Sequence, residues 1–177
     1  PLRTAFTNSH SLNATGGDDA FQYGMTFFYN NTQGVMKGSN RQNVNGDIDL
    51  RYRINKFNLF SRTSIGYLNS EQETVSFAEF SKMNPFYPKY NQDGEAEKIV
   101  DYIGETTPVY NPIWDMNQNS FNENSQLSLT QNFNVEYEPI HRLRLQGNLS
   151  FTTSRAKTER FVSPYASQFD KQPDEKK

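Results

Sequence analysis

Residues 21–31 read FQYGMTFFYNN, and large apolar side chains stand at every second position of this stretch. These side chains are Phe21, Tyr23, Met25, Phe27 and Tyr29. The positions between them are polar or glycine, with Phe28 as the exception. Because successive side chains of an extended chain point to opposite faces, the alternation predicts a β-strand with one apolar and one polar face.

This apolar row belongs to a chain that is polar overall. Of its 177 residues, 34% are hydrophobic and 14% are aromatic, and the mean hydropathy is −0.87. The net charge of −2 provides no basic field, so we expect no nucleic-acid partner. The chain has no cysteine, and His10 and His141 are far apart in the sequence, so we expect no metal and no cofactor. The sequence has no run of about 18 apolar residues that would predict a membrane-spanning helix.

The same alternation returns along much of the chain. Further alternating stretches are residues 4–15, 48–54, 57–68, 127–137 and 143–151. Together with residues 21–31 they predict an all-β fold, in which about six long antiparallel strands follow one another in an up-and-down meander.

The connections between these strands alternate between short and long. Tight turns are expected at 16–19, 55–56 and 139–141, and longer connections at 31–40 and 71–119. All the tight turns then fall at one end of the sheet, as in outer-membrane barrels, and several strands reach the ~9–11 residues that cross a bilayer at a tilt. Aromatic residues also gather near both strand ends, as in the girdles of such barrels. We therefore expect part of a transmembrane β-barrel, with a soluble β-sandwich as the alternative.

The order of local features resembles one family of membrane proteins. A Gly16-Gly17 turn, the aromatic strand, Gln33-Gly34-Val35, an arginine-bearing strand over 41–53 and a turn at 55–57 follow one another. Two later stretches continue the series, MNPFYPKYNQDGE (83–95) and LTQNFNVEYEPIHRLRLQGNLSFTTSRAKTERFVSP (129–164). This series resembles the early barrel of SusC/RagA-type TonB-dependent outer-membrane transporters.

The resemblance implies a function and a set of partners. The chain would supply barrel wall and part of the extracellular mouth of an importer for glycans or oligopeptides in the bacterial outer membrane. Its partners would be outer-membrane lipid, the cargo, a SusD-like surface lipoprotein, and TonB through regions outside this chain. Such transporters close roughly 22 strands around a plug. Residues 1–177 are therefore expected to be a partial barrel, in which 71–119 form a long extracellular loop.

Two readings from other classes stay open beside the importer. One is a soluble β-sandwich that binds carbohydrate through exposed aromatic residues, and the other is a small closed outer-membrane barrel with a structural role. In the importer reading, six strands leave two sheet edges without partners, so we expect the isolated chain neither to insert nor to transport.

Charged residues at Asp47, Asp49, Arg51 and Arg53 alternate onto the predicted polar face, which would face the lumen. They could contact substrate or plug, or neutralise charges on neighbouring strands. Asp47 and Asp49 have the spacing of a glycosidase carboxylate pair only in the sense that any i, i+2 pair does. We therefore expect no enzyme activity and no catalytic residue.

The stretch 71–119 is rich in aromatic residues and proline. Connections beyond about 15 residues are uncommon unless they have a function. Tyr87, Tyr90, Tyr110 and Trp114 are the candidate residues for binding substrate or a partner protein. The alternative is that these rings pack the connection against itself.

Overall fold

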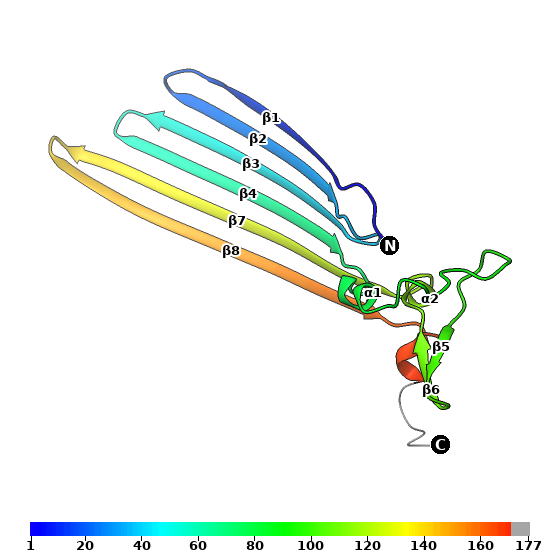
Figure 1. Ribbon diagram of the computed structural model, residues 1–177. Coiled ribbons are helices and arrows are strands. Elements are labelled where there is room, and N and C mark those ends of the chain that lie inside the picture. The colour runs from blue at the N-terminus through cyan, green and yellow to red at the C-terminus, as the bar shows by residue number, and fades with distance from the viewer. Residues whose placement is uncertain (171–177) are drawn as a thin grey trace.

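Six strands form one antiparallel sheet in the computed structural model, which describes residues 1–170 (Figure 1). In chain order they are β1 (Phe6–Gly17), β2 (Phe21–Gln33), β3 (Asn40–Ile54), β4 (Phe57–Glu71), β7 (Phe121–Ile140) and β8 (Leu143–Phe161). Their order in the sheet is their order in the chain, so the predicted all-β fold and up-and-down meander are confirmed. Residues 171–177 of the predicted partial barrel lie outside the described residues.

Several strands run farther than the alternation predicted. β7 begins at Phe121 rather than near residue 127, and β4 ends at Glu71 rather than near residue 68. In these extensions the side chains of both faces are polar, as at Asn124 and Ser125. A stretch that is polar on both sides has no period of two, which is why the sequence pattern missed it.

The short turns lie together at one end of the sheet, at upper left in Figure 1. Positive φ angles, which tight hairpins need, occur there at Gly17 (122°), Asn55 (49°) and Arg142 (74°). Gly17 was predicted within a turn, but it is the last residue of β1 and pairs with Gln22. A Cβ atom at this position would stand 2.1 Å from the carbonyl oxygen of Phe21, so only glycine fits.

These turns are staggered along the strand direction. The last residue pair before the first turn is Gly17 with Gln22, and Gln22 pairs in turn with Arg51 on β3. From Arg51, β3 continues for three residues to Ile54 before the second turn begins. In the same way, Ile54 pairs with Phe57 at the second turn, and Phe57 pairs with Tyr137 on β7. From Tyr137, β7 again continues for three residues to Ile140. Three residues of about 3.3 Å over two strand spacings of about 4.8 Å correspond to a strand tilt of about 45°.

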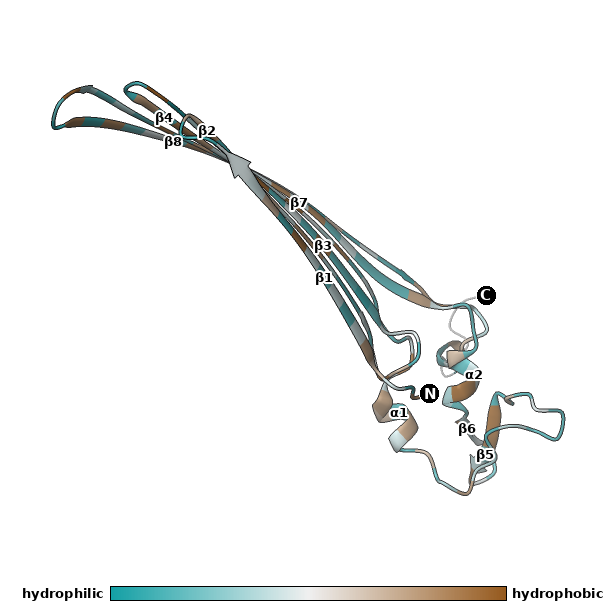
Figure 2. Cartoon of the chain, turned by 90° about the horizontal axis from the view of Figure 1, so that it is seen from above, coloured by the Kyte–Doolittle hydropathy of each residue, from teal (hydrophilic) through white to brown (hydrophobic). Residues whose placement is uncertain are grey.

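The sheet is a single layer. Figure 2 shows it edge on, curved, with no helix or strand packed on either face. No residue in its six strands is buried. Within residues 1–170 the buried apolar side chains are Val75, Ala96, Pro112, Ile113 and Ala166, and all lie outside the sheet. The large apolar residues of the strands therefore have no protein core to enter in the described chain.

Short elements gather at the other end of the sheet (Figure 1). They are α1 (Phe77–Ser81), β5 (Ile99–Ile103), β6 (Thr107–Tyr110), α2 (Pro112–Met116) and the 3-10 helix η1 (Ser167–Phe169). α2 begins after Asn111, whose side chain accepts the N–H of Ile113 at 3.1 Å, and Pro112 stands where a helix needs no N–H. The predicted long connection between β4 and β7 thus has secondary structure of its own.

Candidate functional site

The sheet has one apolar face. Paired residues of neighbouring strands share a face, and the following residues belong to this one: Leu12, Ala14, Phe21, Tyr23, Met25, Phe27, Tyr29, Val44, Ile48, Leu50, Tyr52, Ile54, Phe57, Leu59, Ile65, Tyr67, Leu127, Leu129, Phe133, Val135, Tyr137, Leu143, Leu145, Leu149 and Phe151. Many of these side chains are exposed, and Leu149 keeps 67% of its surface. Exposed apolar surface of this extent marks an interaction surface.

The apolar face has a limited height. On β7 it runs from Leu127 to Tyr137, ten steps of about 3.3 Å or about 33 Å along the strand. At a tilt of about 45° this length spans a height of about 23 Å. Aromatic residues lie near both margins, with the Phe57 and Tyr137 rings stacked 4.3 Å apart at the short-turn side. At the other margin Tyr29 stacks on His10 at 6.2 Å.

Beyond this band, toward the end of the sheet opposite the short turns, the same face is polar. Asn31, Gln42 and Ser125 follow the last apolar residues of their strands. One row farther, Glu71 and Glu159 flank Glu123 on neighbouring strands. The change from apolar to polar therefore occurs at a defined level across the sheet.

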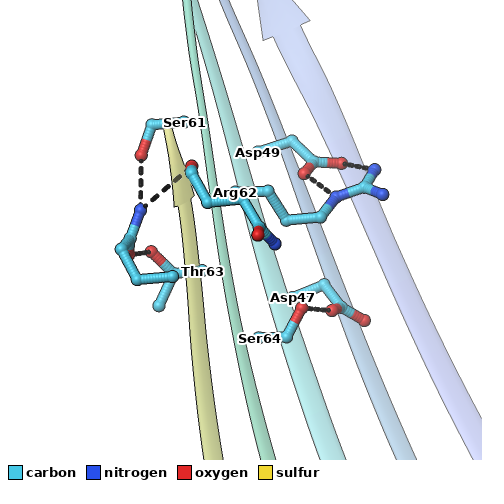
Figure 3. A network of polar contacts seen from close by, with 8 residues as sticks. Asp47, Asp49, Ser61, Arg62, Thr63 and Ser64 are labelled. Carbon is cyan, nitrogen blue, oxygen red and sulfur yellow. Dashed lines mark hydrogen bonds and ion pairs between the residues drawn. The ribbon is translucent and has the colours of Figure 1, made fainter. Parts of the chain in front are cut away.

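Three of the polar side chains on the apolar face bond to one another (Figure 3). Thr63 Oγ1 donates to Gln131 Oε1, and Gln131 Nε2 donates to Ser61 Oγ at 2.9 Å. Polar groups facing an apolar medium must find partners within the protein. This group, which we call the Gln131 triad, does so.

The opposite face is polar, and β3 and β4 carry a charged network on it (Figure 3). Arg62 donates to Asp49 through Nε at 2.5 Å and through its terminal nitrogen at 2.8 Å. Ser64 Oγ donates to Asp47 Oδ1 at 2.5 Å. Asp49 is thus neutralised by an arginine of the neighbouring strand, the arrangement considered from the sequence, whereas Asp47 is bound by an uncharged hydroxyl group.

Arg51 and Arg53 lie on this polar face too, but unlike Arg62 they form no ion pair in the described chain. Within residues 1–170, no carboxylate lies within 4.0 Å of their guanidinium nitrogens. The Arg51 guanidinium carbon stands 5.7 Å from the centre of the Phe60 ring, and that of Arg62 stands at the same distance. In the sequence Phe60 breaks the alternation of residues 57–68, and this break is the signal that places an aromatic ring on the polar face.

Two of the four predicted aromatic residues of the 71–119 connection bond to other parts of the described chain. Trp114 Nε1 donates to the carbonyl oxygen of Tyr165 at 3.3 Å. The Tyr87 hydroxyl bonds to Asp101, and this hydrogen bond raises the pKa of Tyr87. Tyr110 is half-buried, whereas Tyr90 keeps 52% of its surface exposed. The structure therefore places one of the four candidates, Tyr90, in a clearly accessible position.

The segment that follows β8 is bound to α2 through η1. Asp115 in α2 accepts the backbone N–H of Ser167 at 2.8 Å and its hydroxyl at 2.5 Å.

Phe86, which the sequence analysis did not single out, is 93% exposed. Asn84 holds the backbone there, because its side chain accepts the N–H of Phe86 at 3.1 Å. The connection is therefore an ordered unit with an aromatic side chain held in solvent.

Within residues 1–170, no helix is long and apolar enough to cross a bilayer. No group of three or more His, Asp or Glu side chains there could hold a metal ion. Neither a protein-family model nor a curated protein matches the chain.

Proposed function

We propose that this chain forms wall and extracellular mouth of a TonB-dependent importer for glycans or oligopeptides in the bacterial outer membrane. One observation carries the proposal: a single-layer sheet leaves an apolar face of about 23 Å uncovered by protein in the described residues. The apolar band of outer-membrane barrels is about 25 Å tall and has aromatic girdles at both margins. In this proposal the apolar face touches lipid.

The stagger of the short turns supports a barrel. Closing a sheet into a barrel requires tilted strands, typically by 35–45°, and the turns of this sheet give about 45°. The Gln131 triad also suits a lipid-facing surface, since its hydroxyl and amide groups bond to one another. A β-sandwich needs a second sheet over the apolar face. Within residues 1–170 the second sheet, β5–β6, lies beyond the sheet end instead.

The sheet edges favour a larger barrel over a small closed one. β1 and β8 are the outer strands, and they do not pair with each other in the described chain. Open edges are not stable in hydrocarbon. The barrel would therefore be completed by strands outside this chain, and the 177 residues alone would neither insert nor transport.

The partners in this proposal come from the resemblance. A SusD-like surface lipoprotein would meet the elements at the long-loop end, where Phe86 and Tyr90 are exposed. TonB would act through regions outside this chain. The role of these residues is wall, mouth and binding surface, with no catalytic step.

A fluorescence experiment tests which face touches lipid. The chain has no cysteine, so Leu129→Cys and Thr130→Cys, introduced separately into the full-length protein with any other cysteine replaced, place a bimane label on opposite faces of β7. In vesicles with brominated acyl chains we expect strong quenching at position 129 and little at 130. Equal quenching of both labels, or none of either, would contradict the proposal.

A further inference from the structure

The polar face carries a ridge that separates two hollows near the short turns. Phe60 forms its apolar part, and Arg51 and Arg62 lie over the ring at 5.7 Å each. Such contacts between guanidinium groups and an aromatic ring hold the cations in place. Both cations lie against the ring and are exposed to solvent.

The charges of this ridge are not balanced. Arg62 is neutralised by Asp49 through two hydrogen bonds. Arg51 and Arg53 have no carboxylate within 4.0 Å in the described chain. The nearby carboxylate of Glu136 accepts a hydrogen bond from Asn58 at 3.3 Å instead. Arg51, which borders both hollows, and Arg53, which borders the second, therefore bind no carboxylate in the described chain, although Glu136 also lines the second hollow.

The hollows give room beside these arginines. The first has a volume of about 470 Å³ and is bordered by Gly17 and Gly24, which have no side chains to fill it. The second has a volume of about 660 Å³, and Arg51 and Phe60 border both. Each is within the range of small-molecule sites.

The lining of the second hollow is rich in hydrogen-bonding groups. It includes Asn132, Asn134, Asn148 and Ser150. Ser150 donates to Asn132 at 2.6 Å, and Asn134 donates to Asn148. The amide NH₂ groups of Asn132 and Asn148 make no hydrogen bond within residues 1–170, so they can donate to a ligand oxygen.

We propose that the two hollows beside Arg51 and Phe60 bind an acidic oligosaccharide. Arg51 and Arg53 would take a sugar carboxylate, because the planar guanidinium group matches a carboxylate with two parallel hydrogen bonds. Asn132, Asn148 and Ser150 would bind the sugar hydroxyl groups. This inference rests on the proposed function, in which the polar face lines the passage, and it adds that the cargo is anionic.

Calorimetric titration of the purified full-length protein in detergent tests the site. The probes are a galacturonic acid tetrasaccharide and a galactose tetrasaccharide of the same length. At 50 mM salt we expect the acidic probe to bind at least tenfold more tightly, and its affinity to fall as salt is raised. Arg51→Gln combined with Arg53→Gln should weaken acidic-probe binding about tenfold and leave neutral-probe binding unchanged. Arg51→Lys, which keeps the charge without the planar group, should give a smaller loss.

Arg155→Gln is the control for loss of an arginine elsewhere, because it removes a positive charge from the other face of the sheet, where Arg155 pairs with Leu127. Equal affinity for the two probes, an equal loss in the control variant, or no binding by a folded protein would overturn the proposal. Lipid quenching reports separately on the barrel. If the site is overturned while the label at position 129 is quenched, only the cargo inference fails; acidic-probe binding without quenching refutes the importer instead.

Discussion

Asp49 and Arg62 lie directly opposite each other on β3 and β4, and two hydrogen bonds of 2.5 and 2.8 Å join their side chains. Direct pairing across an antiparallel sheet brings side chains of one face together. Arg51 lies two residues from Asp49 on the same strand, but the Asp49 carboxylate hydrogen-bonds to Arg62 and not to Arg51. The contact that joins β3 to β4 therefore also leaves Arg51 without a hydrogen-bonded carboxylate in the described chain.

Exchanging the two partners tests whether this contact stabilises the wall. The Arg62 side chain keeps 49% of its surface exposed and the Asp49 side chain 34%, so solvent screens the pair. We expect Asp49→Asn to lower the free energy of unfolding of the full-length protein by about 0.2–1 kcal/mol. The double variant Asp49→Arg, Arg62→Asp should recover most of the loss in urea titrations. A double variant that is as unstable as the sum of its single substitutions would show that the pair contributes nothing.

Gly17 is predicted to be required at the first hairpin. Its φ of 122° and the Phe21 carbonyl oxygen, 2.1 Å from where a Cβ would stand, both oppose a side chain. We expect Gly17→Ala to lower the free energy of unfolding by more than about 1 kcal/mol. Gly147→Ala is the matched control, since nothing lies within 4 Å of its added carbon, and it should stay within about 0.5 kcal/mol of wild type. Equal effects of the two substitutions would contradict this account.

Acid should weaken the same hairpin through Asp18. Its carboxylate accepts the N–H groups of Phe21 and Ala20 at 2.8 Å, and these hydrogen bonds lower its pKa below 3.8. A lowered pKa in the folded state contributes stability that is present above the unfolded pKa and is lost as pH falls through the folded pKa. Denaturation midpoints between pH 6 and pH 2.5 should therefore show wild type losing stability relative to Asp18→Asn below about pH 4.

Asp19→Asn is the control for this experiment. It removes a charge from the same turn, but Asp19 makes no hydrogen bond to the two amides that Asp18 binds. A difference between wild type and Asp18→Asn that stays constant over the whole range would argue against the hydrogen-bonded carboxylate as the source.

The sequence predicted the strands wherever the two faces differ in polarity. Residues 21–31 and 127–137 alternate clearly, and the structure has strands there. The start of β7 at Phe121 was missed because its first residues are polar on both sides. The group at the sheet end could not be predicted, because contacts such as that between Asp115 and Ser167 join residues 52 positions apart. Local pattern carries no information on such pairs.

On the polar face, too, the sequence predicted some features and not others. Alternation placed Asp49 and Arg51 on one face, but it could not tell which of them would find a partner. That depends on the pairing register, which sets Arg62 opposite Asp49 and Phe60 opposite Arg51. Register is fixed by the turns and by burial of a whole face, rather than by any single residue.

The Gln131 triad gives a test that separates its hydrogen bonds from the apolar surface around it. Gln131→Leu removes the partner of Thr63 and Ser61, and leaves two hydroxyl groups on the apolar face. An unsatisfied polar group away from water costs about 1–3 kcal/mol, whereas replacing all partners by apolar groups can be neutral or stabilising. We therefore expect Gln131→Leu to destabilise the full-length protein in lipid vesicles by about 1–2 kcal/mol.

The triple variant Gln131→Leu, Thr63→Val, Ser61→Ala should regain wild-type stability or exceed it, because no polar group then remains on that part of the face. Urea titration in vesicles, followed by the shift in gel mobility of the folded protein, measures each variant. If water rather than lipid covers this face, the hydroxyl groups left by Gln131→Leu are solvated, and the single variant should cost almost nothing. A single variant as stable as wild type would thus count against both the triad and the lipid contact of the apolar face.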